Sequence, residues 1–234
     1  MVGTRPTGRL QSAAVISRLF SVAVLTLVFI VAAVVVGVDI GARIYTEHQI
    51  ASRAKASTGA ESSNAGIHSF PFLYDLLAES ESKKISVHLT RVPIGPLTID
   101  KVDVTARGVH IDVGYLFSHH KVRLTSIASA DARLTFAAPD ITSVTGVQIS
   151  ITGNTIAASV GGASVPVTVT IAGGHMLILR VAGQKAFSFD VDRSPIIPPC
   201  ALRSSVAASA LVLECQVSPV PPSVVAAISV AASH

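Results

Sequence analysis

The stretch "ISVHLTRV", Ile85 to Val92, alternates apolar and polar residues with the two-residue period of a β-strand. The stretch "PLTIDKVDVTARGVHIDV", Pro96 to Val113, continues the same alternation. Its apolar positions are Leu97, Ile99, Val102 and Val104, followed after Gly108 by Val109, Ile111 and Val113. One face of these strands is therefore apolar, and the burial of that face decides how the rest of the chain folds.

Similar strands are predicted as far as Val191. The segments "VQISITGNTIAASV" and "VPVTVTIAGGHMLILRV" each break at a hairpin-type dipeptide, Gly153-Asn154 in the first and Gly173-Gly174 in the second. The segment "KVRLTSIASADARLTFA" supplies Val122, Leu124, Leu134 and Phe136, and "AFSFDV" supplies Phe187 and Phe189. Short helices are expected around Tyr115 and from Asp140. These strands are predicted to meander in antiparallel order.

Few helices are available to cover the aliphatic face. The candidates are Phe70–Glu79, a short helix near Leu116 and the C-terminal "PSVVAAISVAA". The predicted fold class is α+β: an N-terminal transmembrane helix followed by an elongated, curved antiparallel β-sheet that wraps one or two helices. Because helices are scarce, the sheet is expected either to curl on itself or to leave a cavity that an apolar ligand fills.

The segment "SFPFLYDLLAES", Ser69 to Ser80, changes to a helical period. Its stripe consists of Phe72, Leu73, Leu76 and Leu77. Ser69 is predicted to cap the first turn, and the helix is expected to end near Ser80. Two interpretations of the stripe remain open: an ordinary core helix, or one wall of a slot for an apolar ligand.

Twenty uncharged residues, "LFSVAVLTLVFIVAAVVVGV" from Leu19 to Val38, can cross a membrane as one helix of roughly 30 Å. Arg5, Arg9 and Arg18 precede them and no acidic residue does, which predicts a cytoplasmic N-terminus. The alternative is a secretory signal peptide, although its apolar region is usually only about 7–15 residues long. Under both interpretations the chain after Asp39 is exported.

We therefore predict four regions: a basic cytoplasmic tail (1–18), a transmembrane anchor or uncleaved signal (19–38), a juxtamembrane helix and linker (39–65) and an exported domain (66–234). The predicted location is the cell membrane, with a single pass and the C-terminal domain in the periplasm-like space of a cell envelope. Three of the 18 basic residues and none of the 14 acidic ones precede Asp39, which leaves 15 against 14 in the exported part. Because these charges are scattered, the sequence predicts no nucleic-acid binding.

The two cysteines, Cys200 and Cys215, both lie in the exported part. In an oxidising compartment such a pair is predicted to form a disulfide. A loop of this length is worth about 3 kcal/mol in the chain-entropy account.

No arrangement of residues predicts catalysis, a metal site or a cofactor. The adjacent His119 and His120 lack the i,i+2 or i,i+4 spacing of metal ligands, and the other histidines are scattered. No Gly-x-Ser-x-Gly elbow and no phosphate-binding glycine loop occurs in the sequence. Asp190 and Asp192 would share a strand face, but nothing near them in the sequence would position a substrate. The sequence therefore predicts a protein that is not an enzyme.

The order of "SFPFLYDLLA", a strand and "VPIGPLTIDKVDVTARGVHI" resembles the LmeA-type phospholipid-binding proteins of actinobacterial cell envelopes. The matching positions are Phe70, Pro71, Phe72 and Leu73, then Gly95, Leu97, Val102 and the Arg107-Gly108-Val109 turn. The resemblance spans Ile67 to Val225 and implies an elongated fold akin to the bactericidal/permeability-increasing and tubular lipid-binding domains. It also implies binding of anionic phospholipids, including phosphatidylinositol, and for at least one member a role in lipomannan elongation. One departure is "ESESKK" at 79–84, where members of the family often have a glycine and a basic residue.

Our leading hypothesis is a membrane-anchored lipid-binding module that supports lipoglycan (lipomannan) or envelope-lipid assembly. Its acyl chains would lie in an apolar groove between the 70–77 helix and the sheet. The predicted lining is Phe70, Phe72, Leu73, Leu76 and Leu77 on one side and Val109, Ile111, Leu116, Phe117, Leu134 and Phe136 on the other.

Lys83, Lys84 and Arg91 are candidate donors to the headgroup phosphate, with plain solvent exposure as the alternative. Two other function classes remain open. A structural envelope module with a protein partner and a self-filled core predicts no cavity, and an enzyme requires a polar cleft with convergent titratable groups.

Overall fold

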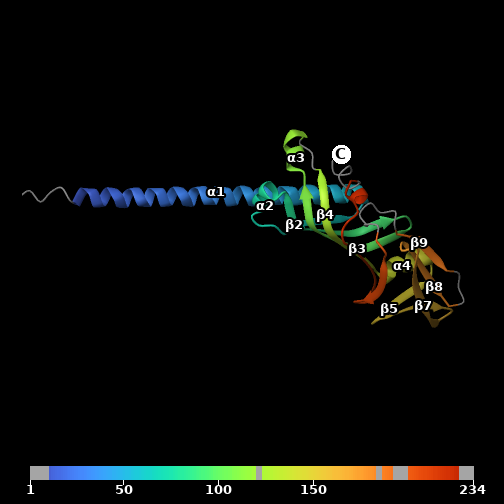
Figure 1. Ribbon diagram of the computed structural model, residues 1–234. Helices are drawn as coiled ribbons and strands as arrows, with labels where there is room; N and C mark the ends of the chain where they lie inside the picture. Colours follow the sequence, from blue (N-terminus) through green and yellow to red (C-terminus); the bar gives the residue numbers. More distant parts are fainter. Residues whose placement is uncertain (1–10, 120–122, 183–185, 192–199, 227–234) are drawn as a thin grey trace, which may run out of the picture. The chain divides into compact units, whose positions relative to one another are not determined.

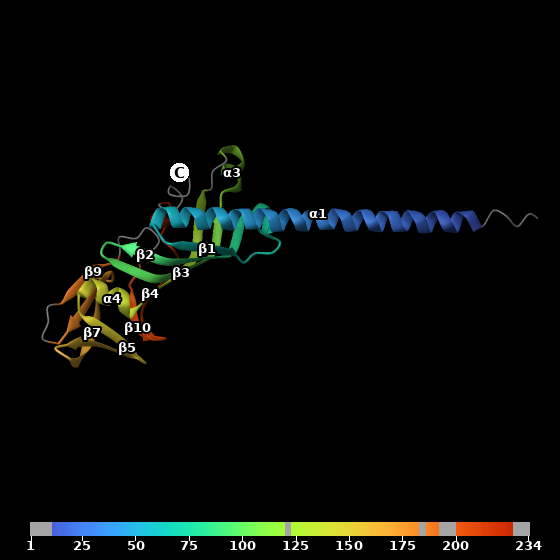
Figure 2. The ribbon, with the colours of Figure 1, turned by 180° about the vertical axis from the view of Figure 1, so that it is seen from behind.

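A computed structural model describes residues 11–119, 123–182, 186–191 and 200–226, apart from the side chains of residues 11–28, 116 and 117. The chain divides into two compact units, Met1–Ala42 and Arg43–His234, and each is described by itself. Figure 1 shows the elements in the colours of the sequence, and Figure 2 shows them from behind.

The described residues of the first unit, 11–42, are helical. α1 (Gln11–Thr58) contains the whole of the predicted apolar run and continues into the second unit. Over the part of α1 whose side chains are described, Phe29–Thr58 is long and apolar enough to cross a membrane, a property that a signal sequence near the N-terminus shares. The predicted N-terminal apolar helix is therefore confirmed.

Six antiparallel strands of the second unit form one sheet in the order β1-β2-β3-β4-β11-β10. They are β1 (Ser62–Ile67), β2 (Glu81–Ile94), β3 (Leu97–Ile111), β4 (Leu124–Phe136), β10 (Arg203–Ala207) and β11 (Ala210–Val217). Cross-strand ion pairs lie on the outer face of this sheet: His88–Asp103, Arg107–Asp131 and Arg133–Glu214. The opposite, apolar face is called the inner face below.

Five further antiparallel strands form a second sheet in the order β5-β6-β7-β8-β9. They are β5 (Gln148–Thr152), β6 (Thr155–Val160), β7 (Ala163–Ala172), β8 (Met176–Val181) and β9 (Phe187–Asp190). The predicted hairpins at Gly153-Asn154 and Gly173-Gly174 are confirmed, because β5 pairs with β6 and β7 with β8 across these turns.

Among the residues that the structure describes, three short helices lie between the strands: α2 (Phe72–Ala78), α3 (Val113–His119) and α4 (Ala138–Thr145). The helices predicted around Tyr115 and from Asp140 are α3 and α4. Residues 222–226 of the predicted C-terminal helix are also helical. α4 ends at Gly146, whose φ of 67° suits glycine.

The larger apolar core is shared by the two sheets. On the inner face of the first sheet, Leu89, Val102, Leu134 and Leu213 lie opposite one another in register. The second sheet contributes Leu177 and Leu179, and α4 contributes Ile141. A smaller cluster at the other end of the first sheet contains Val109, Ile127, Ala130, Val220 and Val225. The predicted α+β class is confirmed, and a second sheet, rather than helices, buries much of the aliphatic face.

Two residues with positive φ reset the in–out alternation of the long strands. Arg91 on β2 has a φ of 55°, and Leu89 and Val92 on either side of it both face the larger core. Gly108 on β3 has a φ of 60°, and Ala106 and Val109 both face the smaller cluster. A strict period of two would place the members of each pair on opposite faces.

Residues 39–65 hold more regular structure than the predicted helix and linker, since α1 continues to Thr58 and β1 begins at Ser62. Strands β10 and β11 were not predicted either. The predicted disulfide between Cys200 and Cys215 is confirmed, with 5.7 Å between the two Cα atoms.

Candidate functional site

The residues predicted to form the first wall divide between the two sides of α2. Phe72 is buried at 5% exposure, and Leu73 and Leu76 are half-buried. Phe70 and Leu77 are 65% and 50% exposed. Because α2 packs against β2, the buried side of the helix rests on the sheet and the remaining apolar side chains face solvent.

A buried carboxylate lies beneath α2. Asp75 Oδ1 accepts a hydrogen bond from Lys83 Nζ at 3.2 Å, and among the residues that the structure describes Asp75 Oδ2 has no hydrogen-bond partner. This hydrogen bond and the charge of Asp75 raise the pKa of Lys83. Ser69 does not cap the helix: its Oγ accepts a hydrogen bond from the Lys83 backbone N–H at 3.1 Å. Lys83, a predicted headgroup ligand, therefore takes part in joining α2 to β2.

The other two predicted headgroup residues have different surroundings. Arg91 Nη1 donates a hydrogen bond to Asp140 Oδ1 at 2.8 Å, which joins β2 to α4. Lys84 is half-buried on β2, opposite Arg107 on β3. Since Arg91 and Lys84 are seven residues apart on one strand, about 23 Å separates their Cα atoms. The three cations do not form one cluster.

The predicted second wall divides between the two apolar clusters. Val109 belongs to the smaller cluster, whereas Leu134 and Phe136 are fully buried in the larger core. Ile111 is half-buried at the end of β3. Leu116 and Phe117 belong to α3, but their side chains lie outside those described.

Between the two clusters, the inner face of β2 and β3 is incompletely covered. Ile85 and Val87 on β2 pair across the sheet with Ala106 and Val104 on β3, and all four side chains are half-buried. We call these four residues the β2–β3 strip. The neighbouring residues in the same rows are buried on both sides, Ala65 and Ile67 on β1 and Ala130 and Ala132 on β4.

The sequence placed Ile85, Val87 and Val104 on an apolar face but did not mark them as binding residues. Alternation shows which way a side chain points, and exposure depends on what lies above it. The strip is therefore a feature that only the tertiary structure reveals.

The second-unit part of α1 lies along the edge of the sheet next to the strip. The backbone N–H of Ile67 donates to Glu47 Oε1 at 2.7 Å, and Ser63 Oγ donates to the carbonyl oxygen of Ala51. Arg43 Nε donates to the same Glu47 oxygen at 2.9 Å. These bonds occupy polar groups of the edge strand β1, which would otherwise be free to pair with another chain.

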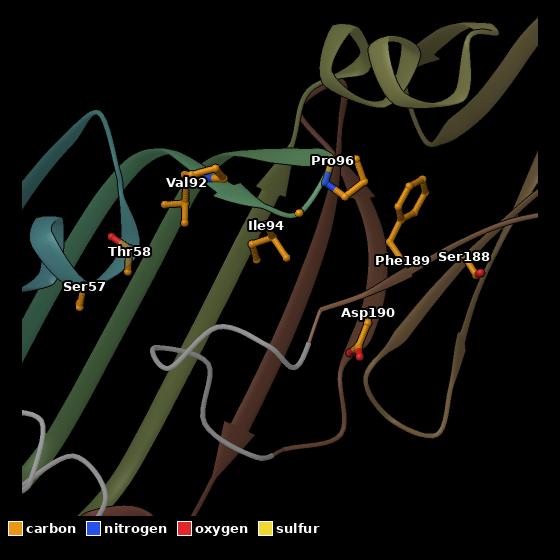
Figure 3. A pocket seen from close by; sticks show the side chains of 10 residues that line it. Ser57, Thr58, Val92, Ile94, Pro96, Ser188, Phe189 and Asp190 are labelled. Atoms are coloured by element: carbon orange, nitrogen blue, oxygen red, sulfur yellow. The ribbon is translucent and has the colours of Figure 1, made fainter.

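A cleft of about 380 Å³ opens where β2 turns into β3 (Figure 3). Its apolar lining includes Val92, Ile94 and Pro96 of this hairpin and Phe189 of β9, and its polar lining includes Thr58 and Ser188. Its volume lies at the lower end of the range of roughly 300–1,000 Å³ for small-molecule sites. None of the predicted lining residues lines this cleft, but β2 carries both the cleft and the β2–β3 strip.

The described residues hold no group of three or more histidine, cysteine, aspartate or glutamate side chains that could bind a metal ion. His88 pairs with Asp103 on the outer face, and His119 stacks on Tyr115 with 4.2 Å between ring centroids. The chemistry that these residues offer is apolar contact together with a few hydroxyl and ionic groups.

A family model described as LmeA-like phospholipid-binding matches residues 37–221. No curated protein and no solved structure matches the chain.

Proposed function

The chain belongs to the LmeA-like phospholipid-binding family, whose model covers most of its length, and from this premise we propose that it is a membrane-anchored envelope protein that holds phospholipid acyl chains against the inner face of its first sheet. The anchor is α1, with the second unit outside the membrane. The finer part of the proposal is that the lipid is anionic, of the phosphatidylinositol type, and that the protein supports lipoglycan assembly.

The observation that carries this proposal is the half-buried state of the β2–β3 strip. Four aliphatic side chains keep contact with water although the residues beside them in the same rows are buried. Each methylene group removed from water contributes about 0.8 kcal/mol, so an acyl chain laid along the strip gains several kcal/mol without a strong polar contact.

The surroundings of the strip define the rest of the proposed site. The strip lies on β2, against which α2 packs, so we include Phe72, Leu73 and Leu76 in the lining. The cleft at the hairpin takes the end of an acyl chain, because Val92 continues the inner face of β2 toward it. We name no headgroup ligand among the predicted cations, because Lys83 and Arg91 already pair with Asp75 and Asp140 and Lys84 lies opposite Arg107 of the outer face.

Native mass spectrometry of the full chain, extracted in mild detergent, tests the proposal. We expect phospholipid to copurify with the wild-type chain and to be depleted in Ala106→Phe, whose ring would occupy the strip. Loss of contact with two methylene groups costs about 1.6 kcal/mol, which corresponds to roughly tenfold less bound lipid.

Thr105→Phe is the matched control, because Thr105 lies on the outer face of the same strand, opposite Ser86 and Asp131. It adds the same ring without entering the strip and should retain lipid. A wild-type chain without lipid, or equal lipid in both variants, would contradict the proposed site and favour a structural module with a filled core.

A further inference from the structure

The exposed large apolar side chains of the second unit gather at a few positions. Among its described residues there are six such side chains, and five of them are Ile44, Tyr45, Phe70, Tyr74 and Leu77. Tyr74 and Leu77 are three residues apart on α2 and share its solvent-facing side, while Phe70 precedes the first turn. Single exposed apolar residues are ordinary on a protein surface, but a concentration of them marks an interaction site.

The five residues come from two segments, α1 with Ile44 and Tyr45, and the α2 region with the other three. A hydrogen bond places both segments at the same end of the second unit. Glu47, half a turn beyond Tyr45 on α1, accepts the backbone N–H of Ile67 at 2.7 Å. Ile67 in turn ends β1, three residues before Phe70. The exposed side chains of α2 therefore lie close to the point where the chain enters the second unit at Arg43.

We propose that these five residues form a docking patch that inserts into the interfacial layer of the bilayer to which α1 is anchored. The inference rests on the proposed anchorage, because Ile44 follows Val38, the last residue of the apolar run, by only six positions. Even a fully extended chain of that length spans about 20 Å, so the patch cannot leave the neighbourhood of the membrane surface. Two tyrosines suit this layer, where rings with one apolar and one polar end are enriched.

The charges around the patch indicate which force would drive docking. Near α2, Asp75, Glu79 and Glu81 lie beside Lys83 and Lys84, and next to Ile44 the cation Arg43 pairs with Glu47, so cations are not in excess around the patch. Such a surface gains nothing from anionic lipids, which attract polybasic segments. Docking should therefore depend on apolar burial and be insensitive to anionic lipid content and to salt.

The absence of tryptophan from the sequence makes the test direct. Tyr74→Trp places a single tryptophan in the patch of the full chain, which is reconstituted into phosphatidylcholine vesicles with or without brominated acyl chains. Because an interfacial helix sits about 5–10 Å into the headgroup and acyl boundary, brominated lipid should reduce the emission at position 74 roughly twofold, with a blue-shifted maximum. Phosphatidylglycerol added to the vesicles should not change the quenching.

Met176→Trp is the matched control, since Met176 is the sixth exposed large apolar side chain among the described residues of the unit and lies on β8 of the second sheet. Its emission should stay unquenched and red-shifted. Phe70→Ser with Leu77→Ser should abolish quenching of the tryptophan at position 74. An unquenched, red-shifted tryptophan at position 74 would overturn the proposal, and a blue shift without quenching would overturn it in favour of a protein partner or a second copy of the chain.

Two further measurements separate this proposal from the proposed function. Resistance of the chain to alkaline extraction from the vesicles reports anchorage by α1 independently of the patch. Ala106→Phe in the Tyr74→Trp chain lowers lipid binding at the proposed site roughly tenfold, so quenching that persists undiminished at position 74 comes from the bilayer. Quenching that disappears in this variant would instead come from a bound lipid and would overturn docking.

Discussion

Asp75 is a carboxylate held beneath α2 whose one cationic partner among the described residues is Lys83. A buried charge that loses its partner is costly, because no water replaces the lost interaction. Lys83→Met should therefore lower stability at neutral pH, whereas Lys84→Met should have little effect because Lys84 does not pair with this carboxylate.

The raised pKa of Lys83 gives this difference a pH dependence. A lysine whose folded pKa exceeds its unfolded value of about 10.4 stabilises the fold fully below that pH and loses this contribution as pH rises through the folded pKa. The urea midpoints of the wild-type chain and Lys83→Met should thus converge above pH of about 10.4. A gap that stays constant into alkaline solution would contradict the proposed role of the ion pair.

Gly108 illustrates how one residue controls the inner face. Its φ is 60°, and a Cβ built there would lie 2.7 Å from Cβ of Ala128. Gly108→Ala should lower the free energy of unfolding by about 1–2 kcal/mol because of the left-handed backbone. The close contact with Ala128 should lower it further. Gly153 has a φ of 58°, and a Cβ built there has no neighbouring atom within 4 Å. Gly153→Ala therefore measures the cost of the left-handed backbone alone. Chemical unfolding of both variants should show the larger loss for Gly108→Ala, and equal losses would rule out the contact.

The sequence predicted the burial of the sheet residues better than the burial of the residues at and before α2. Leu134 and Phe136 were expected on the apolar face and are fully buried, as period-two alternation requires. Phe70 and Leu77 were expected in the lining and are exposed, since the helical stripe does not reveal which neighbour covers which side. Arg91 and Gly108 shift the alternation through positive φ values, which a residue type alone indicates only for glycine.

At the scale of elements, the edge of the first sheet depends on α1. The carboxylate of Glu47 accepts the N–H of Ile67 on β1 and also binds Arg43. Glu47→Ala should leave this N–H without a partner and cost about 1.5–3 kcal/mol, the range for hydrogen bonds to charged groups. Glu47→Gln retains an acceptor oxygen and should cost less.

Amide hydrogen exchange reports this contact at the residue concerned. The Ile67 amide should exchange faster in Glu47→Ala than in Glu47→Gln, while amides of the second sheet remain unchanged. Equal exchange rates at Ile67 in the two variants would show that α1 does not protect the edge of β1.

The elements that the sequence missed have weak local patterns. β1 has the sequence "SSNAGI", in which two residues other than glycine are apolar. Its pairing with β2 depends on long-range contacts. β10 is a mostly exposed edge strand, and β11 has three consecutive buried residues in place of a simple alternation. Such segments become strands because a partner strand is available, which one local window of sequence does not show.

At the scale of the whole second unit, the central feature is a core shared by two open sheets. The scarcity of helices led to the expectation of a curled sheet or a ligand cavity, and the larger part of the apolar face is in fact covered by the second sheet. Within the part of the chain that the structure describes, the β2–β3 strip between the two clusters is only half-covered. The physical reason is geometric, because the second sheet covers one end of the first sheet's inner face and residues 220–225 cover part of the other.

If a lipid completes this interior, its binding must stabilise the folded chain. A ligand that binds only the folded state at 100 times its dissociation constant adds about 2.7 kcal/mol of stability. For a unit of this size each kcal/mol raises the melting temperature by about 2–4 °C, so we expect an increase of roughly 5–11 °C when phospholipid is restored to the delipidated chain. Calorimetry in a detergent held at fixed concentration measures this increase. Ala106→Phe should show about half of this increase, because roughly tenfold weaker binding leaves the lipid at about ten times its dissociation constant, and Thr105→Phe should show the wild-type increase. The prediction fails if restored lipid leaves the wild-type melting temperature unchanged, since a site that contributes to the interior cannot be filled without stabilising the fold.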